Sequence, residues 1–157
     1  MADDSDISGM ACLRAAQSGA GTEHDWSERI SGYIRGTVHP LQSLAARIIY
    51  VAIKEEEVVG FIAGHLTRRF GCDGELQWIN VGPEYRGLGI SSKLLQQLAA
   101  WFTSHKALYI CVDCAPDNTI AQKFYKRNGA ENLNAHWLTW KDISVLCKDT
   151  DPSDVSN

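Results

Sequence analysis

The pattern of hydrophobic and polar residues changes along the chain, and its middle part predicts a group of strands. Residues 47–53 (RIIYVAI) and 58–68 (VVGFIAGHLTR) are apolar and rich in β-branched residues, which favour strands. The charged residues 54–57 between them predict a hairpin turn. Residues 75–81 (ELQWINV) predict a third strand. Regular alternation places one set of its side chains on one face and the other set on the opposite face: Glu75, Gln77, Ile79 and Val81 against Leu76, Trp78 and Asn80.

After residue 89 the apolar residues recur with the period of a helix. The stripe consists of Ile90, Leu94, Leu95, Leu98, Trp101 and Phe102. Residues 107–114 (ALYICVDC) have almost no polar positions, which is typical of a parallel strand covered on both faces. Strand, helix and strand at this spacing predict a crossover unit. Residues 119–128 predict a second amphipathic helix, and residues 136–143 a closing strand.

The first part of the chain predicts one strand and one helix. Residues 7–14 are assigned to a strand. A helix follows Thr22, which with Asp25 three residues later resembles a capping box, and Gly36 ends it. A short helical turn is expected at residues 40–46.

Together these elements predict an α/β fold with a mixed central sheet. The sheet is antiparallel in its first half and parallel where residues 90–106 cross over. A chain of 157 residues suits one domain. We assign it residues 8–146, with flexible ends at residues 1–7 and 147–157, where the composition is polar.

Composition narrows the classes of partner. The net charge of −4 argues against nucleic acid, and no apolar run approaches the ~20 residues that span a membrane. The acidic start of the chain is unlike a signal peptide, so we expect the cytoplasm. Five scattered cysteines fit a reducing compartment, and Cys111 and Cys114 are expected to be core thiols because no second pair completes a metal site.

Residues 81–95 (VGPEYRGLGISSKLL) carry the main candidate for chemistry. A turn with Gly87 and Gly89 leads directly into the predicted central helix. Glycine allows consecutive backbone N–H groups to point to one place, and a helix N-terminus adds unpaired donors and partial positive charge. Residues 86–91 can therefore cradle a phosphate or diphosphate. A plain connecting turn is the equally open alternative at this point.

The turn reads Glu84-Tyr85-Arg86-Gly87-Leu88-Gly89, and it resembles the Q/R-x-x-G-x-G/A motif of the GNAT acyltransferase superfamily. Glutamate at the first position and Ser91, where the family often has Gly or Ala, depart from that pattern. Residues 118–130 (NTIAQKFYKRNGA) resemble the family's second motif, an Asn followed by a helix that ends in F-Y-x-x-x-G. The resemblance covers residues 47–143.

The resemblance implies an acyl-CoA site. In this family the strands that correspond to residues 75–81 and 107–114 splay apart to admit the pantetheine arm of CoA, and helices cover both faces of the sheet. Carried over to this chain, the cofactor-binding residues are Ile79, Asn80, Val81, Arg86, Gly87, Leu88, Gly89, Ile90, Ser91, Asn118 and Tyr125. Asn118 is also a good N-cap, and the two roles are compatible.

The resemblance also implies two catalytic side chains. Tyr125 corresponds to the tyrosine that protonates the departing CoA thiolate, with a core aromatic residue as the alternative. Glu75 stands where some members supply a general base, and an exposed carboxylate at a strand start is the alternative. Asp73 and His65 are weaker candidates for the base. No metal is implied.

The predicted function is therefore an acetyl-CoA-dependent N-acetyltransferase that moves the acetyl group to a primary amine by direct attack in a ternary complex. The acceptor is a small molecule or a peptide amine, and a homodimer is left open. The alternatives are a non-catalytic acyl-CoA sensor and an interaction domain on the same fold. Guesses for substrate-facing groups are Trp26, Tyr33, Arg68, Arg69 and His136.

Overall fold

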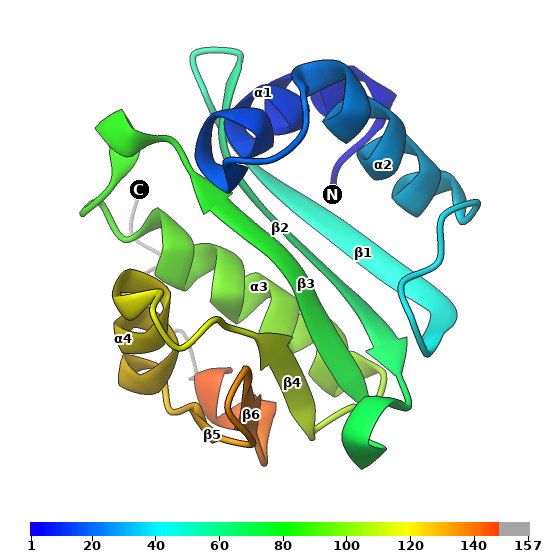
Figure 1. Cartoon of the computed structure of the whole chain (residues 1–157), viewed down its shortest axis with the longest axis vertical. Coiled ribbons are helices and arrows are strands. Elements are labelled where there is room, and N and C mark those ends of the chain that lie inside the picture. The colour runs from blue at the N-terminus through cyan, green and yellow to red at the C-terminus, as the bar shows by residue number, and fades with distance from the viewer. Residues whose placement is uncertain (148–157) are drawn as a thin grey trace, which may run out of the picture.

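A computed structural model describes residues 1–147, and within them it places six strands in one mixed sheet (Figure 1). In spatial order the strands are β1 (Ser43–Lys54), β2 (Glu57–Thr67), β3 (Gly74–Val81), β4 (Ile110–Asp113), β6 (Trp137–Trp140) and β5 (Glu131–Asn132). Only the pair β3 and β4 is parallel, and the other neighbours are antiparallel. The predicted α/β fold class is confirmed.

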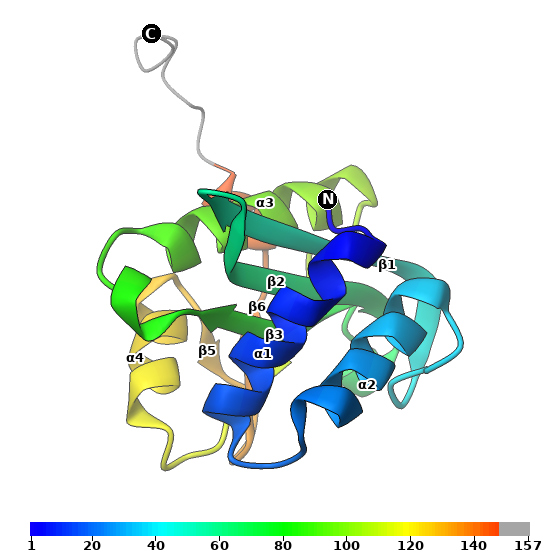
Figure 2. The ribbon, with the colours of Figure 1, turned by 90° about the horizontal axis from the view of Figure 1, so that it is seen from above.

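Four α-helices surround the sheet in the described part of the chain: α1 (Ile7–Ser18), α2 (Glu23–Arg35), α3 (Ile90–Ser104) and α4 (Thr119–Arg127). Helices α1 and α2 cover one face, which we call the α2 face, and α3 covers the other, the α3 face (Figures 1 and 2). Helix α4 lies beside β4 and β5 at the edge of the molecule. Short 3-10 turns occupy Asp4–Asp6, Arg69–Gly71, Pro83–Tyr85 and Ile143–Leu146.

The sheet separates two hydrophobic clusters. On the α2 face the cluster contains Met10, Trp26, Ile30, Tyr33 and Phe61. The larger cluster on the α3 face is built around the predicted helical stripe, of which Leu94, Leu95, Leu98 and Phe102 are buried. Helix α3 approaches closely because β3 starts with a glycine: a Cβ on Gly74 would lie 2.4 Å from Phe102.

The helix predicted after Thr22 is confirmed with its caps. The Thr22 side chain accepts from the Asp25 N–H, and the Asp25 carboxylate accepts from the Thr22 N–H. Gly36, at φ 69°, ends α2 in the left-handed conformation, and its N–H donates to the Gly32 and Tyr33 carbonyls.

The predictions for the segments before and after this helix are wrong. Residues 7–14 form helix α1 instead of a strand, because Ile7, Met10, Ala11 and Ala15 share one helix face that packs in the α2-face cluster. Residues 40–46 contain no helix. Strand β1 begins at Ser43, which pairs with Thr67 of β2.

The strands of the second half are shorter than predicted. Strand β4 begins only at Ile110. The backbone N–H groups of Leu108 and Tyr109 donate to the Asp73 side chain and not to the backbone of a neighbouring strand. The closing strand is limited to β6, which pairs with the short β5 that the sequence pattern did not indicate.

A β-bulge in β3 corrects the predicted alternation of its side chains. Ala63 and Gly64 of β2 are consecutive, yet they face Trp78 and Leu76, so Gln77 is an extra residue in β3. Leu76 consequently shares the α3-face cluster with Ile79 and Val81, whereas Trp78 packs in the α2-face cluster. Glu75 lies on the α2 face, opposite to Ile79 and Val81.

The two ends of the chain are the segments predicted to be flexible. In the predicted flexible segment 1–7, the Ala2 N–H donates to the Ile49 carbonyl at 2.8 Å. Residues 148–157 of the predicted C-terminal tail lie outside the described residues.

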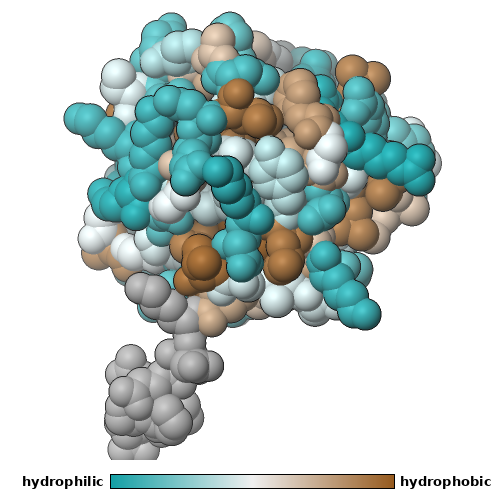
Figure 3. All heavy atoms as spheres, turned by 90° about the horizontal axis from the view of Figure 1, so that it is seen from below, coloured by the Kyte–Doolittle hydropathy of each residue, from teal (hydrophilic) through white to brown (hydrophobic). Residues whose placement is uncertain are grey.

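On the face in Figure 3, hydrophobic groups are scattered between hydrophilic ones. Among residues 1–147 no helix has the length and apolar character needed to cross a membrane.

Candidate acyl-CoA site

Strands β3 and β4 are paired over only three positions. Gly74, Glu75 and Leu76 face Ile110, Cys111 and Val112, respectively, and no pair follows in the described ladder. Strand β3 continues to Val81, whereas the Cys114 N–H beyond β4 donates to His136 on the other side. The strands therefore separate after Leu76, as predicted, and we call this gap between them the β3–β4 opening. The bulge at Gln77 comes immediately after the last pair, and bulges bend and twist a strand.

The backbone of β3 presents polar groups to this opening. The Gly82 N–H donates to the Val59 carbonyl of β2, so Asn80 and Trp78, two and four residues earlier, also direct their backbone groups to β2. Ile79 and Val81 lie between them and direct theirs to the opening. The Val81 carbonyl accepts from the Gln17 side chain at 3.0 Å, which leaves the Val81 N–H and both groups of Ile79 facing the opening.

The glycine turn has the conformation of an anion cradle. Gly87 and Gly89 have φ values of 78° and 79°, and Gly89 is the N-cap of α3. A Cβ on either glycine would meet nothing within 4 Å, so the backbone conformation, and not space, favours glycine there. In the described part of the chain no well-formed hydrogen bond occupies the N–H groups of residues 87–92. Six consecutive donors are thus available at the start of α3.

Helix α4, which follows β4 in the chain, carries the second motif. The Asn118 side chain accepts from the Ala121 N–H at 3.2 Å, so its N-cap role is present in the structure. Tyr125 is 5% exposed and packs edge-on against Trp140. Its hydroxyl has no hydrogen-bond partner among residues 1–147 and is not enclosed by protein, so the phenol oxygen reaches the surface.

Burial raises the pKa of Tyr125, and the neighbouring Cys114 raises it further. Arg14 opposes this effect and Asp113 adds to it, so both charges lie near the phenol. The Arg14 Nη1–H donates to the Asn80 side chain at 3.1 Å, and the guanidinium lies 4.8 Å from the Trp26 ring centre.

Glu75 is buried, so the alternative of an exposed carboxylate is wrong. It is 5% exposed, and its Oε2 lies 3.2 Å from Arg69 Nε and 3.4 Å from His65 Nε2. His65 is fully buried inside the sheet. Asp73 holds the amides of Leu108 and Tyr109 and has a structural role.

Sequence reasoning missed two charged groups near Tyr125. Arg14 was hidden because residues 7–14 were assigned to a strand, and Asp113 ends an otherwise apolar run. The side chain of Asn80 faces α1, where Arg14 and Gln17 bind it, so its backbone alone can serve a cofactor. A helical period in residues 7–18 would have pointed to Arg14.

The guesses for substrate-facing groups have mixed outcomes. Trp26 and Tyr33 are buried core residues of α2 that contact Trp78. Arg69 binds Glu75 and lies 4.8 Å from the Trp137 ring centre. Arg68 and His136 are exposed and their side chains form no hydrogen bond or ion pair within residues 1–147, so their assignment stays a prediction.

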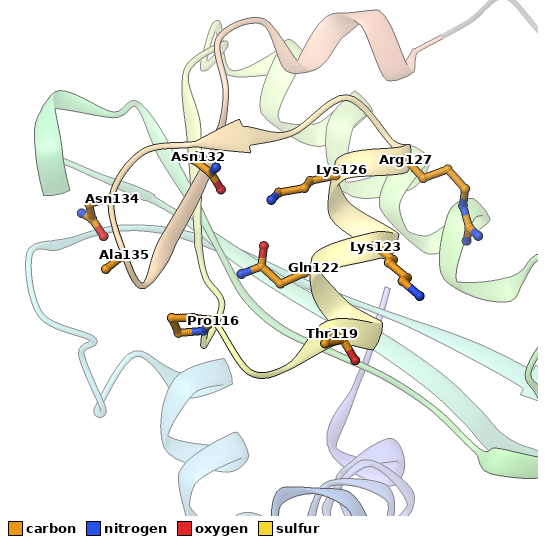
Figure 4. Close-up of a pocket in the computed structure, with 9 residues that line it drawn as sticks. All are labelled: Pro116, Thr119, Gln122, Lys123, Lys126, Arg127, Asn132, Asn134 and Ala135. Carbon is orange, nitrogen blue, oxygen red and sulfur yellow. The ribbon is translucent and has the colours of Figure 1, made fainter.

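A separate cavity of about 960 Å³ lies between α4 and the β5–β6 turn (Figure 4). Gln122 and Lys126 point across it toward Asn132, whereas Lys123 and Arg127 point away from Asn132. None of the residues predicted to bind the cofactor lines this cavity. It therefore lies outside the candidate acyl-CoA site.

In this chain two parallel strands separate beside a helix N-terminus that has free amides. This arrangement defines a class of α/β protein that can hold an extended ligand with a diphosphate group. The family model for the acetyltransferase (GNAT) family matches residues 20–130, so the chain belongs to the GNAT family.

Curated relatives carry related names. The aminoglycoside N(6′)-acetyltransferase type 1 of Salmonella typhimurium is 27% identical over 88 residues, which are 52% of this chain and 61% of the relative. An uncharacterized N-acetyltransferase of Methanocaldococcus jannaschii is 34% identical over 88 residues, 55% of this chain and 54% of the relative. The match thus spans little more than half the length of these proteins.

Solved structures share the fold. The PaiA N-acetyltransferase of Thermoplasma acidophilum in complex with coenzyme A superposes with a TM-score of 0.68 at 16% identity, covering 90% of this chain and 95% of that one. An aminoglycoside 6′-N-acetyltransferase complexed with coenzyme A gives 0.68 at 17% identity, covering 87% and 90%.

Proposed function

We propose that this protein is an acetyl-CoA-dependent N-acetyltransferase that acts on a primary amine. The observation that carries the proposal is the β3–β4 opening next to the free N–H groups of residues 87–92. Membership of the GNAT family and the coenzyme A in related structures support the same cofactor.

The residues at the opening fit coenzyme A in chemical terms. The free amides of residues 87–92 and the positive end of α3 suit a diphosphate, and Arg86 adds a full charge. The backbone groups of Ile79 and the Val81 N–H suit the amides of a pantetheine arm, in the way an added strand pairs with a sheet edge.

Acetyl-CoA supplies the acetyl group as a thioester. Tyr125 gives its proton to the departing thiolate, because its raised pKa keeps the phenol protonated and its oxygen is not enclosed. A backbone N–H of residues 79–81 stabilises negative charge on the reacting carbonyl oxygen. A free amine is mostly protonated at pH 7, and only about one part in a thousand is neutral and able to attack. Glu75 therefore takes the proton that the amine must lose. No covalent acyl-enzyme is needed.

The acceptor is proposed to be a small molecule. Several relatives and neighbours are named as aminoglycoside acetyltransferases, which act on amines of small molecules. A peptide or protein amine is the second candidate, because the β4 and β6 part of the α2 face is not covered by a helix (Figure 1).

The test is release of free CoA thiol by the purified protein with acetyl-, propionyl- and succinyl-CoA across a panel of amines that includes aminoglycosides, amino acids, polyamines and peptides. Turnover with acetyl-CoA and one class of amine is expected. Binding of CoA, seen as a rise in Tm, without turnover would favour the sensor. Neither binding nor turnover would favour the interaction domain.

A further inference from the structure

A chain of buried polar side chains connects α2 to Glu75. The Tyr33 hydroxyl lies 3.0 Å from His65 Nδ1, and His65 Nε2 lies 3.4 Å from Glu75 Oε2. Tyr33 is 1% exposed and His65 is 0% exposed, so neither exchanges its partner for water. Buried polar groups of this kind are costly unless they are paired, and their pairing fixes their orientation.

The two oxygens of Glu75 have different surroundings. Oε2 contacts both His65 and Arg69, whose Nε lies 3.2 Å away. Oε1 has no hydrogen-bond partner among residues 1–147, and it is not sealed from solvent. The carboxylate is therefore held by one oxygen while the other is free to take a proton from an amine or through water.

Tyr33 determines which nitrogen of His65 carries the proton. Burial raises the pKa of Tyr33, so its hydroxyl keeps its proton, and His65 Nδ1 at 3.0 Å is the acceptor within its reach. Donation to Nδ1 leaves the imidazole proton on Nε2, the ring nitrogen that lies 3.4 Å from Glu75 Oε2. In the other tautomer a nitrogen lone pair would lie beside the carboxylate. The 3.4 Å contact between Nε2 and Oε2 is electrostatic, because it lacks the geometry of a hydrogen bond, and Nε2 has no hydrogen-bond partner among residues 1–147.

We infer that Tyr33 and His65 are positioning residues that orient the Glu75 carboxylate, with Oε2 held beside His65 and Oε1 free to act as the base. The inference rests on the proposed function, and it adds two residues that touch neither substrate. The titratable or charged groups around Glu75 and its partners are Tyr33, Arg47, His65, Arg69, Cys72 and Cys111.

The first test is Tyr33→Phe, which removes only the hydroxyl. Nδ1 then loses its donor, the proton can shift to Nδ1, and the positive end of the Nε2–H dipole is no longer beside Oε2. A carboxylate that loses nearby positive charge binds its proton more tightly. The acid limb of the kcat/KM profile is expected to move to higher pH, with a fall in kcat of about 3- to 10-fold and an unchanged KM for acetyl-CoA.

The matched control is Tyr50→Phe. Tyr50 is half-buried and packs with the α3-face cluster, away from Glu75. This variant is expected to keep the wild-type profile. Tyr33→Phe with a wild-type acid limb and kcat, in a protein that does turn over, would overturn the positioning role and leave the proposed function standing.

Two substitutions of His65 distinguish a role of its Nε2 nitrogen beside Glu75 from a role in packing alone. The amide nitrogen of His65→Gln can occupy the place of Nε2 and donate to Glu75, whereas His65→Asn is too short and reaches only the place of Nδ1. Gln is expected to restore most of the wild-type acid limb, and Asn is expected to behave like Tyr33→Phe. Equal profiles in variants of equal Tm would contradict the inference.

A readout without turnover is the ¹⁵N NMR spectrum of His65. The chemical shifts of the two ring nitrogens identify the protonated one. The wild type is expected to show the proton on Nε2, and Tyr33→Phe a mixture or the Nδ1 form. A proton on Nδ1 in the wild type would refute the inference even in an active enzyme. Absence of turnover with every donor would instead refute the proposed function, and the NMR result would still decide the tautomer.

Discussion

Tyr125 is set apart from an ordinary core aromatic residue by the position of its hydroxyl. The ring is packed against Trp140 and Phe124, but the oxygen reaches the surface without a partner in the described residues. A phenol that only filled space would gain nothing from this arrangement. The raised pKa keeps the proton on Tyr125 until it is needed by a thiolate.

Tyr125→Phe is expected to lower kcat about 100-fold or more, which is the usual range for loss of a general acid. CoA affinity and Tm are expected to change little, because the hydroxyl makes no hydrogen bond with residues 1–147. In the wild type, the raised pKa means that the acid is lost only above pH 10, so kcat is expected to show no fall from this group below that pH. The rate of thiol release between pH 6 and 10 measures the loss of kcat in the variant and the pH profile of the wild type.

The control for this substitution is Tyr109→Phe, at a half-buried tyrosine outside the opening. An unchanged kcat in Tyr125→Phe would remove the proposed acid, and water would have to protonate the thiolate.

At the level of single residues, the sequence predicted the groups that lie in local motifs and assigned other roles to those that are brought in by packing. Asn118 and Tyr125 are identified by spacing within one helix. The neighbours that decide the chemistry of Glu75 come from β2 and from a turn: His65 and Arg69. No spacing rule connects such residues, because only the sheet register brings them together.

Among the elements, the turn before α3 depends on two glycines for its conformation. Gly87 and Gly89 hold the left-handed conformation, which costs other residues roughly 1–2 kcal/mol each. This conformation directs the free amides to one side, so a change of conformation would scatter them.

Gly89→Ala is expected to lower the free energy of unfolding by about 1–2 kcal/mol and to raise the Kd for CoA about tenfold, because the turn relaxes away from the left-handed region. Gly36→Ala is the matched control. Gly36 has φ 69° and open space around its Cα, but it ends α2. It is expected to lose similar stability and to keep the wild-type Kd. Urea unfolding and calorimetric titration measure the two quantities, and equal Kd values would count against the cradle.

Asn118→Ser separates the cap of α4 from a contact with the cofactor. Serine caps helices about as well as asparagine, so Tm is expected to stay within a few degrees of the wild type. The variant lacks the amide N–H₂ group, so the Kd for CoA is expected to rise about 3- to 10-fold if that group binds pantetheine. Asn118→Ala, which loses both roles, is the reference. A wild-type Kd in Asn118→Ser would leave Asn118 as a cap alone.

At the level of elements, periodicity worked where one face was long and strongly apolar, as in α3. It failed for α1, whose short run of small and apolar residues fits either period. It also failed inside β3, because a bulge changes the alternation without leaving a mark in the composition.

For the whole molecule, buried ionisable groups make stability depend on pH. Burial raises the pKa of the Cys111 thiol and of the Tyr33 phenol, both of which are buried. An unfolded thiol loses its proton near pH ~8.5 and an unfolded phenol near pH ~10, whereas the folded protein keeps both protons. Stability is therefore full below these values and falls as the pH rises above them.

The free energy of unfolding is expected to fall by about 1.4 kcal/mol per pH unit for each such group above its unfolded pKa. Cys111→Ala removes one of the groups, so its slope between pH 9 and 10 is expected to be flatter, although its stability at pH 7 is lower because of the cavity. Urea unfolding at pH 7, 9, 9.5 and 10 measures the slopes. Parallel curves for the two proteins would contradict this account.

The extra residue in β3 has a consequence for how this protein can change over time. Substitutions around Gln77 alter one side chain at a time, but loss of a single codon there would restore regular alternation in the strand. The residues from Trp78 to Val81 would keep their faces and their β2 partners, because Leu76 and Trp78 already face consecutive residues of β2, but the bend would be lost and the β3–β4 ladder could continue past Leu76. A one-residue deletion would thus close the β3–β4 opening. The number of residues in β3 is therefore under a stricter constraint than the identity of each residue.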